Sequence, residues 1–249
     1  MTADDLVQDR AQAQASFAPA PSFTFQAVEY LAARLCHDLV GPVGAIHNGL
    51  ELIEDSRQEA MTTGEEGPLD EALGLIGHSA EQASRRLRLY RYAFGSAGVN
   101  PPDGFESLRV AAEEWLDGSL VRLDWSSEAV PPVLGGKAAL GKLILALLLL
   151  GAEALPRGGR LRVVGAGNLA SGQVIVTADA ATVRLAQGMA EALTAPLEQT
   201  SHLNPRTVLP YFLRQLARQY GYRLILPPLD AGGGLSGTWP LAVTWPASA

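Results

Sequence analysis

The sequence predicts an α+β protein in which an N-terminal antiparallel helical hairpin precedes an α/β sandwich. Three observations predict this class. Apolar residues recur at helical spacing along two long segments within the first hundred residues. The segment GSAGVNPPDG at 95–104, rich in glycine and proline, then interrupts this pattern. After it, short helical segments alternate with short strands, which is typical of helices packed on one face of a mixed sheet.

The composition excludes several classes of function. The chain has 249 residues, of which 47% are hydrophobic, and its formal net charge is −7. Nucleic-acid binders usually carry a basic surface, so we expect no nucleic-acid partner. The single cysteine, Cys36, excludes an intramolecular disulfide and suits the reducing cytoplasm. The most apolar run, LILALLLL at 143–150, is too short to span a bilayer and predicts a buried helix. We therefore expect a cytoplasmic protein without a membrane partner.

The N-terminal part predicts a short tail and the helical hairpin. Residues 1–22 are rich in Ala, Gln and Pro, and we expect a disordered tail there. A first long helix ends near residue 53, a polar loop follows at 54–68, and a second helix spans 69–94. We assign residues 23–97 to this hairpin. Its apolar stripe leaves one side uncovered, so we predict that two chains pair into a four-helix bundle, as a homodimer.

The second predicted domain spans residues 104–246. Its apolar patterns alternate between the periods of helix and strand. The predicted helices lie at 104–117, about 137–155, 182–193 and 205–219, and the predicted strands lie at 119–125, 159–167, 172–179, 222–228 and 238–245.

The candidate reactive residue, His37, lies in the stretch LAARLCHDLVGP at 31–42. It is about 200° around the helix from both Leu35 and Leu39, so it points away from the apolar stripe. A solvent-facing histidine without a function is the alternative. The same outer stripe carries small residues where exposed helices usually carry Lys, Glu or Arg, which leaves room beside the imidazole. These stripe residues are Gly41, Gly44 or Ala45, and Asn48.

Poor helix formers accumulate after the histidine. Glycine costs about 1 kcal/mol and proline about 3 kcal/mol relative to alanine inside a helix. Pro42 lacks an amide hydrogen and its ring crowds the carbonyl of Asp38, so we expect a bend there. Close approach of two helices is the alternative explanation for Gly41, Gly44 and Gly49, although it would leave the exposed histidine unexplained.

The register of the hairpin predicts a basic cluster beside His37. If the helices turn at 54–68, His37 lies level with Arg85, and Arg34 lies level with Arg88. Four arginines of the second helix miss its apolar stripe, so we expect several of them to be exposed near the histidine: Arg85, Arg86, Arg88 and Arg91. Such a cluster favours an acidic partner surface or a phosphoryl group. A solvated basic helix end is the alternative. We therefore expect a docking surface formed by Arg34, Gly41, Pro42, Gly44, Asn48, Arg85 and Arg88.

The motif HDLVGP at 37–42 resembles the H-(D/E)-x-x-x-P box of two-component histidine kinases. More closely, RLCHDLVGPVGAIHNGLELIED at 34–55 resembles the ChpT-like histidine phosphotransferases, and the similar layout covers residues 23–245. The resemblance implies that His37 is the phosphoacceptor and that Asp38 supports it; a simply solvated Asp38 is the alternative. It also implies a second domain similar to the kinase ATPase domain but without nucleotide binding.

The sequence departs from the kinase nucleotide boxes at three places. Leu147 and Gly151 stand where a kinase has asparagines, and leucine cannot ligate a hard cation. Asp179 remains in TADAATV without the neighbouring glycines, and LNPRTVLPYF at 203–212 replaces the second glycine-rich box. We therefore expect no cofactor of the chain's own, and the resemblance implies that Mg²⁺ comes from the receiver domain of the partner.

The activity that the resemblance implies is a phosphorelay. Neutral His37 would accept a phosphoryl group from the receiver aspartate of a hybrid histidine kinase and pass it to the receiver of one or more response regulators. Two alternatives remain: a divergent ATP-dependent histidine kinase, and a non-catalytic dimeric adaptor that docks response regulators. The other histidines, His47, His78 and His202, have no comparable setting, and we interpret them as structural or incidental.

Overall fold

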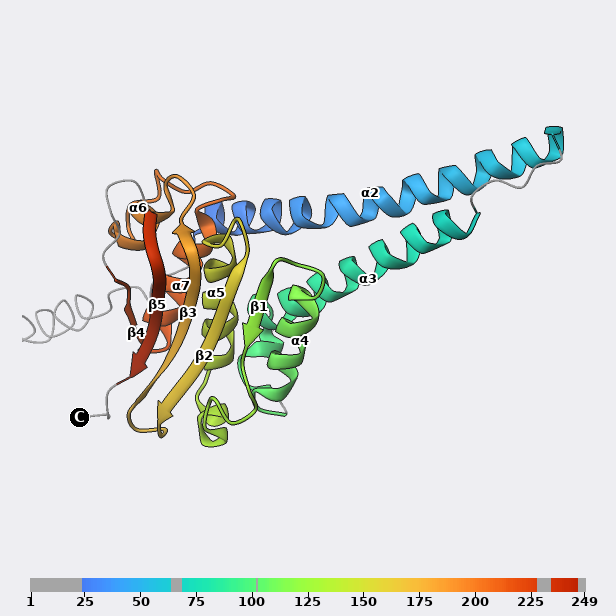
Figure 1. The fold of residues 1–249 in the computed structure, drawn as a ribbon. Coiled ribbons are helices and arrows are strands. Elements are labelled where there is room, and N and C mark those ends of the chain that lie inside the picture. Colours follow the sequence, from blue (N-terminus) through green and yellow to red (C-terminus); the bar gives the residue numbers. More distant parts are fainter. Residues whose placement is uncertain (1–23, 64–68, 102, 228–233, 246–249) are drawn as a thin grey trace, which may run out of the picture.

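The computed structural model describes residues 24–63, 69–101, 103–227 and 234–245 (Figure 1). A long helical hairpin extends from a domain built on a β-sheet, and the hairpin tip lies far from the sheet. The α+β class predicted from the sequence is therefore confirmed. The predicted tail over 1–22 lies outside the described residues.

The hairpin consists of α2 (Phe25–Thr63) and α3 (Leu69–Ala93). Helix α2 continues through Pro42 and extends ten residues beyond the expected end, so the prediction of a loop from residue 54 was wrong. The physical reason is composition, because EDSRQEAMTT at 54–63 contains neither glycine nor proline and includes good helix formers such as Glu, Gln, Ala and Met.

The two hairpin helices approach each other closely through small residues. On α3 the buried positions include Ala72, Ser79 and Ala83. On α2, a Cβ atom at Gly49 would lie 2.6 Å from Cγ1 of Ile76. Close helix approach therefore explains Gly49. It does not explain Gly41 and Gly44, because a Cβ atom at either would meet nothing within 4 Å.

In the part of the chain that the structure describes, five strands form one sheet in the order β1-β2-β3-β5-β4. Strands β1 and β2 are parallel and the other neighbours are antiparallel, so the predicted mixed sheet is confirmed. The bounds are β1 (Val121–Asp124), β2 (Gly159–Gly167), β3 (Gly172–Arg184), β4 (Arg223–Ile225) and β5 (Gly234–Trp245).

Helices cover one face of this sheet, as predicted, with α5 and α7 behind the strands and α4 beside β1 (Figure 1). Every residue of α5 from Leu140 to Gly151 is buried, so the apolar run at 143–150 is the predicted buried helix. Among the described residues, no helix is long and apolar enough to cross a membrane. The bounds are α4 (Glu106–Leu116), α5 (Leu140–Glu153), α6 (Met189–Thr194) and α7 (Val208–Gln219), with short 3-10 helices η1 (Ser96–Gly98) and η2 (Pro132–Gly136).

The expected helix at 182–193 was wrong in its first half. Strand β3 runs on to Arg184 because, after an irregularity that follows Ala180, it pairs again with β5 through Val183. Helix α6 begins only at Met189, after Gly188 adopts a left-handed conformation with φ of 82°.

The hairpin packs against the second domain at its base. Ala27 of α2 is buried in a cluster with Val208 and Tyr211 of α7. At the end of α3, Phe94 contacts Phe212 of α7 edge to face, with ring centroids 5.1 Å apart. These contacts place the turn of α2 that carries His37 beside the second domain.

Candidate functional site

His37 projects from α2 with its side chain 88% exposed, as its position off the apolar stripe predicted. Its Nδ1 atom lies 3.3 Å from Oδ1 of Asp38. In the neutral imidazole, one nitrogen carries the proton and the other carries a lone pair. If Nδ1–H donates to Asp38, the lone pair resides on the exposed Nε2. The pair thus has the arrangement of a nucleophile beside an orienting carboxylate.

Helix α3 holds Asp38 from the opposite side. The hydroxyl of Tyr90 donates a hydrogen bond of 2.6 Å to Oδ2 of Asp38. Burial, together with this hydrogen bond, raises the pKa of the Tyr90 hydroxyl, so Tyr90 remains a donor at neutral pH. Both carboxylate oxygens of Asp38 therefore face a partner, one on His37 and one on Tyr90.

The backbone of Asp38 is held as well. In an uninterrupted helix, the carbonyl of Asp38 would accept a hydrogen bond from the amide of residue 42, but Pro42 has no amide hydrogen. Arg86 donates from Nη1 to this carbonyl oxygen. An arginine of α3 therefore satisfies the acceptor that the proline leaves without its helical donor.

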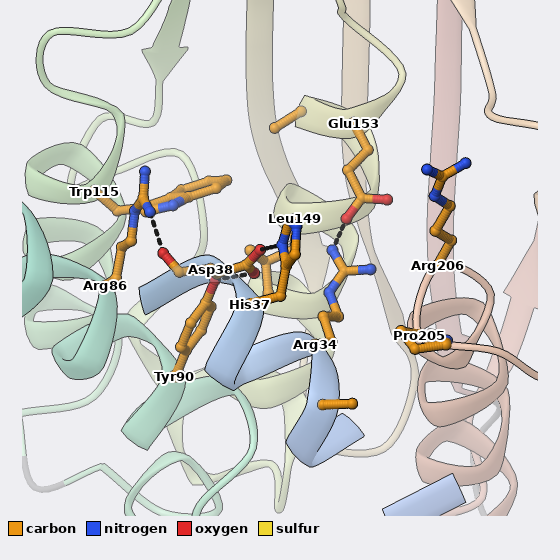
Figure 2. A pocket seen from close by; sticks show the side chains of 12 residues that line it. Arg34, His37, Asp38, Arg86, Tyr90, Trp115, Leu149, Glu153, Pro205 and Arg206 are labelled. Atoms are coloured by element: carbon orange, nitrogen blue, oxygen red, sulfur yellow. Dashed lines mark hydrogen bonds and ion pairs between the residues drawn. The ribbon is translucent and has the colours of Figure 1, made fainter. Parts of the chain in front are cut away.

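A cavity of about 740 Å³ opens beside these residues, between the hairpin and the second domain (Figure 2). Helices α2 and α3 form one wall, and α4, α5 and the segment before α7 form the other. Figure 2 shows His37, Asp38 and Tyr90 close together, with Arg206 across the cavity. The lining residues are Ala33, Arg34, His37, Asp38, Arg86, Tyr90, Trp115, Leu149, Ala152, Glu153, Pro205 and Arg206.

An ion pair joins the two walls of this cavity. Arg34 of α2 pairs with Glu153, the last residue of α5. The Arg34 side chain is only 15% exposed. Burial lowers its pKa, and the charge of Asp38 opposes that shift. Arginine stays protonated in proteins, so the positive guanidinium of Arg34 lies one turn before His37 with its charge compensated by Glu153.

Arg85 and Arg88 of α3, which we expected beside His37, form ion pairs outside the cavity. Arg85 pairs with Glu81 and with Asp117, at 2.7 and 2.6 Å, and Arg88 pairs with Glu114 of α4. Neither arginine lines the cavity. The predicted register is nearly right, but Arg86, rather than Arg85, reaches the turn that carries His37.

The stripe beyond His37 divides into exposed and buried positions. Gly41 and Asn48 are exposed, and Gly44 is partly exposed beside open space. Pro42, which we also expected at the docking surface, is buried. The reason is helical geometry, because position 42 is one turn from Leu39 and Ile46 on the side that faces α3.

The other three histidines, His47, His78 and His202, do not line this cavity. His47 pairs with Glu51 at 3.3 Å on the same helix, and His78 contacts Gln82 at 2.8 Å. Within the described ranges, no group of three or more His, Cys, Asp or Glu side chains could hold a metal ion. Leu147, which stands where a kinase would have an asparagine, is fully buried.

Sequence reasoning missed most of the cavity wall. Tyr90 belongs to the apolar stripe of α3, where its hydroxyl gives no separate signal. Trp115, Glu153 and Arg206 come from the second domain, and only the fold brings them to His37. Arg86 was one of the arginines expected near His37, but its contact with the Asp38 carbonyl was not predicted.

Comparisons with known proteins identify a matching family model, one relative and two solved structures. The family model described as the histidine phosphotransferase C-terminal domain matches residues 105–231. Protein phosphotransferase ChpT of Brucella abortus (strain 2308) is 34% identical over 197 residues, covering 78% of this chain and 86% of that protein. A solved bacterial phosphotransferase aligns with a TM-score of 0.67 and 28% identity, covering 90% of this chain and 98% of the other. The Acinetobacter baumannii histidine kinase AdeS aligns with a TM-score of 0.39 and 12% identity, over 86% and 98%.

Proposed function

Since this chain belongs to the ChpT-type family of histidine phosphotransferases and is a protein phosphotransferase of a phosphorelay, we propose that His37 is its phosphoacceptor. The observation that carries the proposal is the exposed imidazole at the cavity, with Nδ1 facing Asp38 at 3.3 Å. This arrangement leaves Nε2 accessible to a partner. The other histidines make local contacts away from the cavity or do not line it.

The relay runs between two receiver domains. His37 takes a phosphoryl group from the receiver aspartate of a hybrid kinase and returns it to the receiver aspartate of a response regulator. Positioning and charge stabilisation supply most of the catalysis in such transfers. Mg²⁺ belongs to the receiver domain, so the chain itself supplies the nucleophile and a docking surface.

The docking surface includes both walls of the cavity. Gly41 and Gly44 leave the helix surface bare beside His37. Arg206 and Trp115 bring the second domain to the same cavity, which supports a role for that domain in contacting the receiver. The arginines that line the cavity favour an acidic partner that carries an anionic phosphoryl group.

The second domain does not bind ATP in this proposal. The asparagine positions of a kinase N box correspond to Leu147 and Gly151. Leu147 is fully buried, and a side chain at Gly151 would meet Leu161 at 2.8 Å. Neither position presents an oxygen ligand for a metal–nucleotide complex.

A homodimer completes the proposal. The hairpin exposes large apolar side chains along both helices, and burying such a surface is the usual reason for pairing two hairpins. These residues include Val40, Val43, Leu50, Leu69, Leu73 and Leu87. Light scattering at micromolar concentration should give the mass of two chains, and a monomer would contradict this part of the proposal.

A transfer assay tests the phosphoacceptor. The full chain is incubated with receiver domains that carry a radiolabelled aspartyl phosphate. Wild type should take up the label in an alkali-stable, acid-labile form, as expected of phosphohistidine. His37→Gln should take up none, and the matched control His47→Gln should behave as wild type.

The same assay separates the alternatives. Labelling of His37 by ATP without a receiver would establish the divergent kinase. Receiver binding without any uptake by wild type would establish the adaptor. Uptake by His37→Gln would overturn the assignment of His37.

A further inference from the structure

We propose that Tyr90 is a positioning residue for phosphoryl transfer: it holds the Asp38 carboxylate against Nδ1 of His37, so that Nε2 keeps the lone pair. This inference rests on the proposed function of His37. It extends the site from α2 to a residue of α3 that lies 53 positions later in the chain.

Solvent exposure decreases from His37 to Asp38 to Tyr90. His37 is 88% exposed, the Asp38 side chain is 29% exposed, and Tyr90 is 8% exposed. A carboxylate beside an exposed histidine would otherwise rotate freely. Here, Oδ2 of Asp38 is fixed by a hydrogen bond of 2.6 Å, which directs Oδ1 toward Nδ1 of His37.

Tyr90 is itself held by the core. Its ring lies 5.7 Å from the ring of Phe94, which in turn contacts Phe212 of α7. Arg86 fixes the backbone of the same turn through the carbonyl of Asp38. The position of an exposed imidazole is therefore determined by a rigid support that includes both the hairpin and the second domain.

The chemistry of transfer shows why this support matters. The lone pair of Nε2 forms the N–P bond, while the P–O bond to the receiver aspartate breaks and its electrons return to that carboxylate. The proton on Nδ1 stays in place, so the imidazole becomes positively charged as the N–P bond forms. A carboxylate held at Nδ1 stabilises that charge and favours the reactive tautomer beforehand.

Tyr90→Phe is the direct test, because it removes the hydroxyl and keeps the ring. At saturating receiver, we expect the transfer rate constant to fall about tenfold, the magnitude associated with losing one hydrogen bond to a charged group. The receiver concentration at half-maximal rate should stay unchanged, because the hydroxyl that is removed faces Asp38 and the ring remains. Tyr92→Phe, which alters a tyrosine outside the cavity, is the matched control.

A second readout does not depend on a receiver. Nitrogen NMR of the full, unphosphorylated chain reports which ring nitrogen of His37 carries the proton. Wild type should be protonated mainly at Nδ1, and Tyr90→Phe should shift the population toward protonation at Nε2. In an Asp38→Asn background, Tyr90→Phe should add no further loss of rate.

Wild-type transfer and an unchanged tautomer ratio in Tyr90→Phe would overturn the proposal. If that variant fails to fold, 3-fluorotyrosine at position 90 keeps the shape and strengthens the donor; an unchanged His37 spectrum would then overturn it. If wild type takes up no phosphoryl group, the proposed function fails, whereas the spectra still decide the role of Tyr90.

Discussion

Arg86 donates a hydrogen bond to the carbonyl oxygen of Asp38, the acceptor that would receive the amide of residue 42 if that residue were not proline. The two residues lie on different helices of the hairpin. A sequence element that looks unfavourable within α2 is thus compensated by a side chain from α3. The compensation holds in place the turn that carries His37.

Removing the Arg86 guanidinium should therefore affect both stability and transfer. Arg86→Leu leaves the partly buried Asp38 carbonyl without this donor. An unpaired polar group costs about 1–3 kcal/mol when it is fully buried, so the cost here lies toward the lower end, at about 1 kcal/mol. We expect the free energy of unfolding, measured with urea, to fall by that amount. Phosphoryl uptake should slow as the His37 turn loosens.

Arg88→Leu is the matched control, because Arg88 forms an exposed ion pair with Glu114. Exposed pairs contribute about 1 kcal/mol or less. Equal losses of stability in the two variants would contradict a special role for Arg86.

The ion pair between Arg34 and Glu153 predicts that the hairpin and the second domain are coupled. Glu153→Gln removes the charge that faces a guanidinium only 15% exposed. Breaking a fully buried pair costs about 3–5 kcal/mol, and partial exposure reduces this to roughly 1–3 kcal/mol. We expect a lower midpoint of urea unfolding.

Glu198→Gln provides the comparison for this pair. Glu198 pairs with Arg218 at 3.1 Å, and both side chains are more than half exposed. Its removal should change the stability by less than about 1 kcal/mol. A loss as large as that of Glu153→Gln would show that burial of Arg34 is not the cause.

Alkaline pH should destabilise the fold. Burial, together with a hydrogen bond to Asp38 for Tyr90, raises the pKa of the Tyr90 and Tyr222 hydroxyls in the folded state. The unfolded chain loses these protons at about pH 10, while the folded chain retains them. Fewer protons are then bound in the unfolded state, so stability falls as pH rises above about 10.

The measurement is the free energy of unfolding between pH 8 and pH 11. Tyr90→Phe should flatten the decline above pH 10, and the double variant with Tyr222→Phe should flatten it further. A decline as steep in the double variant as in wild type would assign the alkaline loss to other groups.

Local patterns in the sequence predicted much of the fold. Helical spacing identified the hairpin, and the apolar run at 143–150 identified the buried α5. The errors lie where local signals are weak. The polar segment 54–63 has no apolar periodicity, yet it continues helix α2. Residues 182–184 belong to β3 because this strand pairs with β5, which lies far away in the sequence.

The site was predicted only where it depends on one helix. The exposure of His37 follows from its angle around α2, whereas the supporting role of Asp38 was implied by the family resemblance. Tyr90 and Glu153 belong to other elements, and their contacts with this turn depend on tertiary packing. Pro42 was expected at the docking surface, and only the structure shows that it is buried.

The glycines of α2 should respond in opposite ways to alanine. At Gly41 a methyl group meets nothing within 4 Å, so Gly41→Ala should stabilise the chain by up to about 1 kcal/mol through helix propensity. At Gly49 the same methyl would lie 2.6 Å from Ile76, so Gly49→Ala should destabilise the hairpin by about 1–3 kcal/mol. Urea unfolding of the two variants gives the comparison.

Because Gly41 borders His37 on the bare stripe, Gly41→Gln should also slow transfer by raising the receiver concentration needed for half-maximal rate. Wild-type transfer by Gly41→Gln would show that the receiver does not dock across this turn.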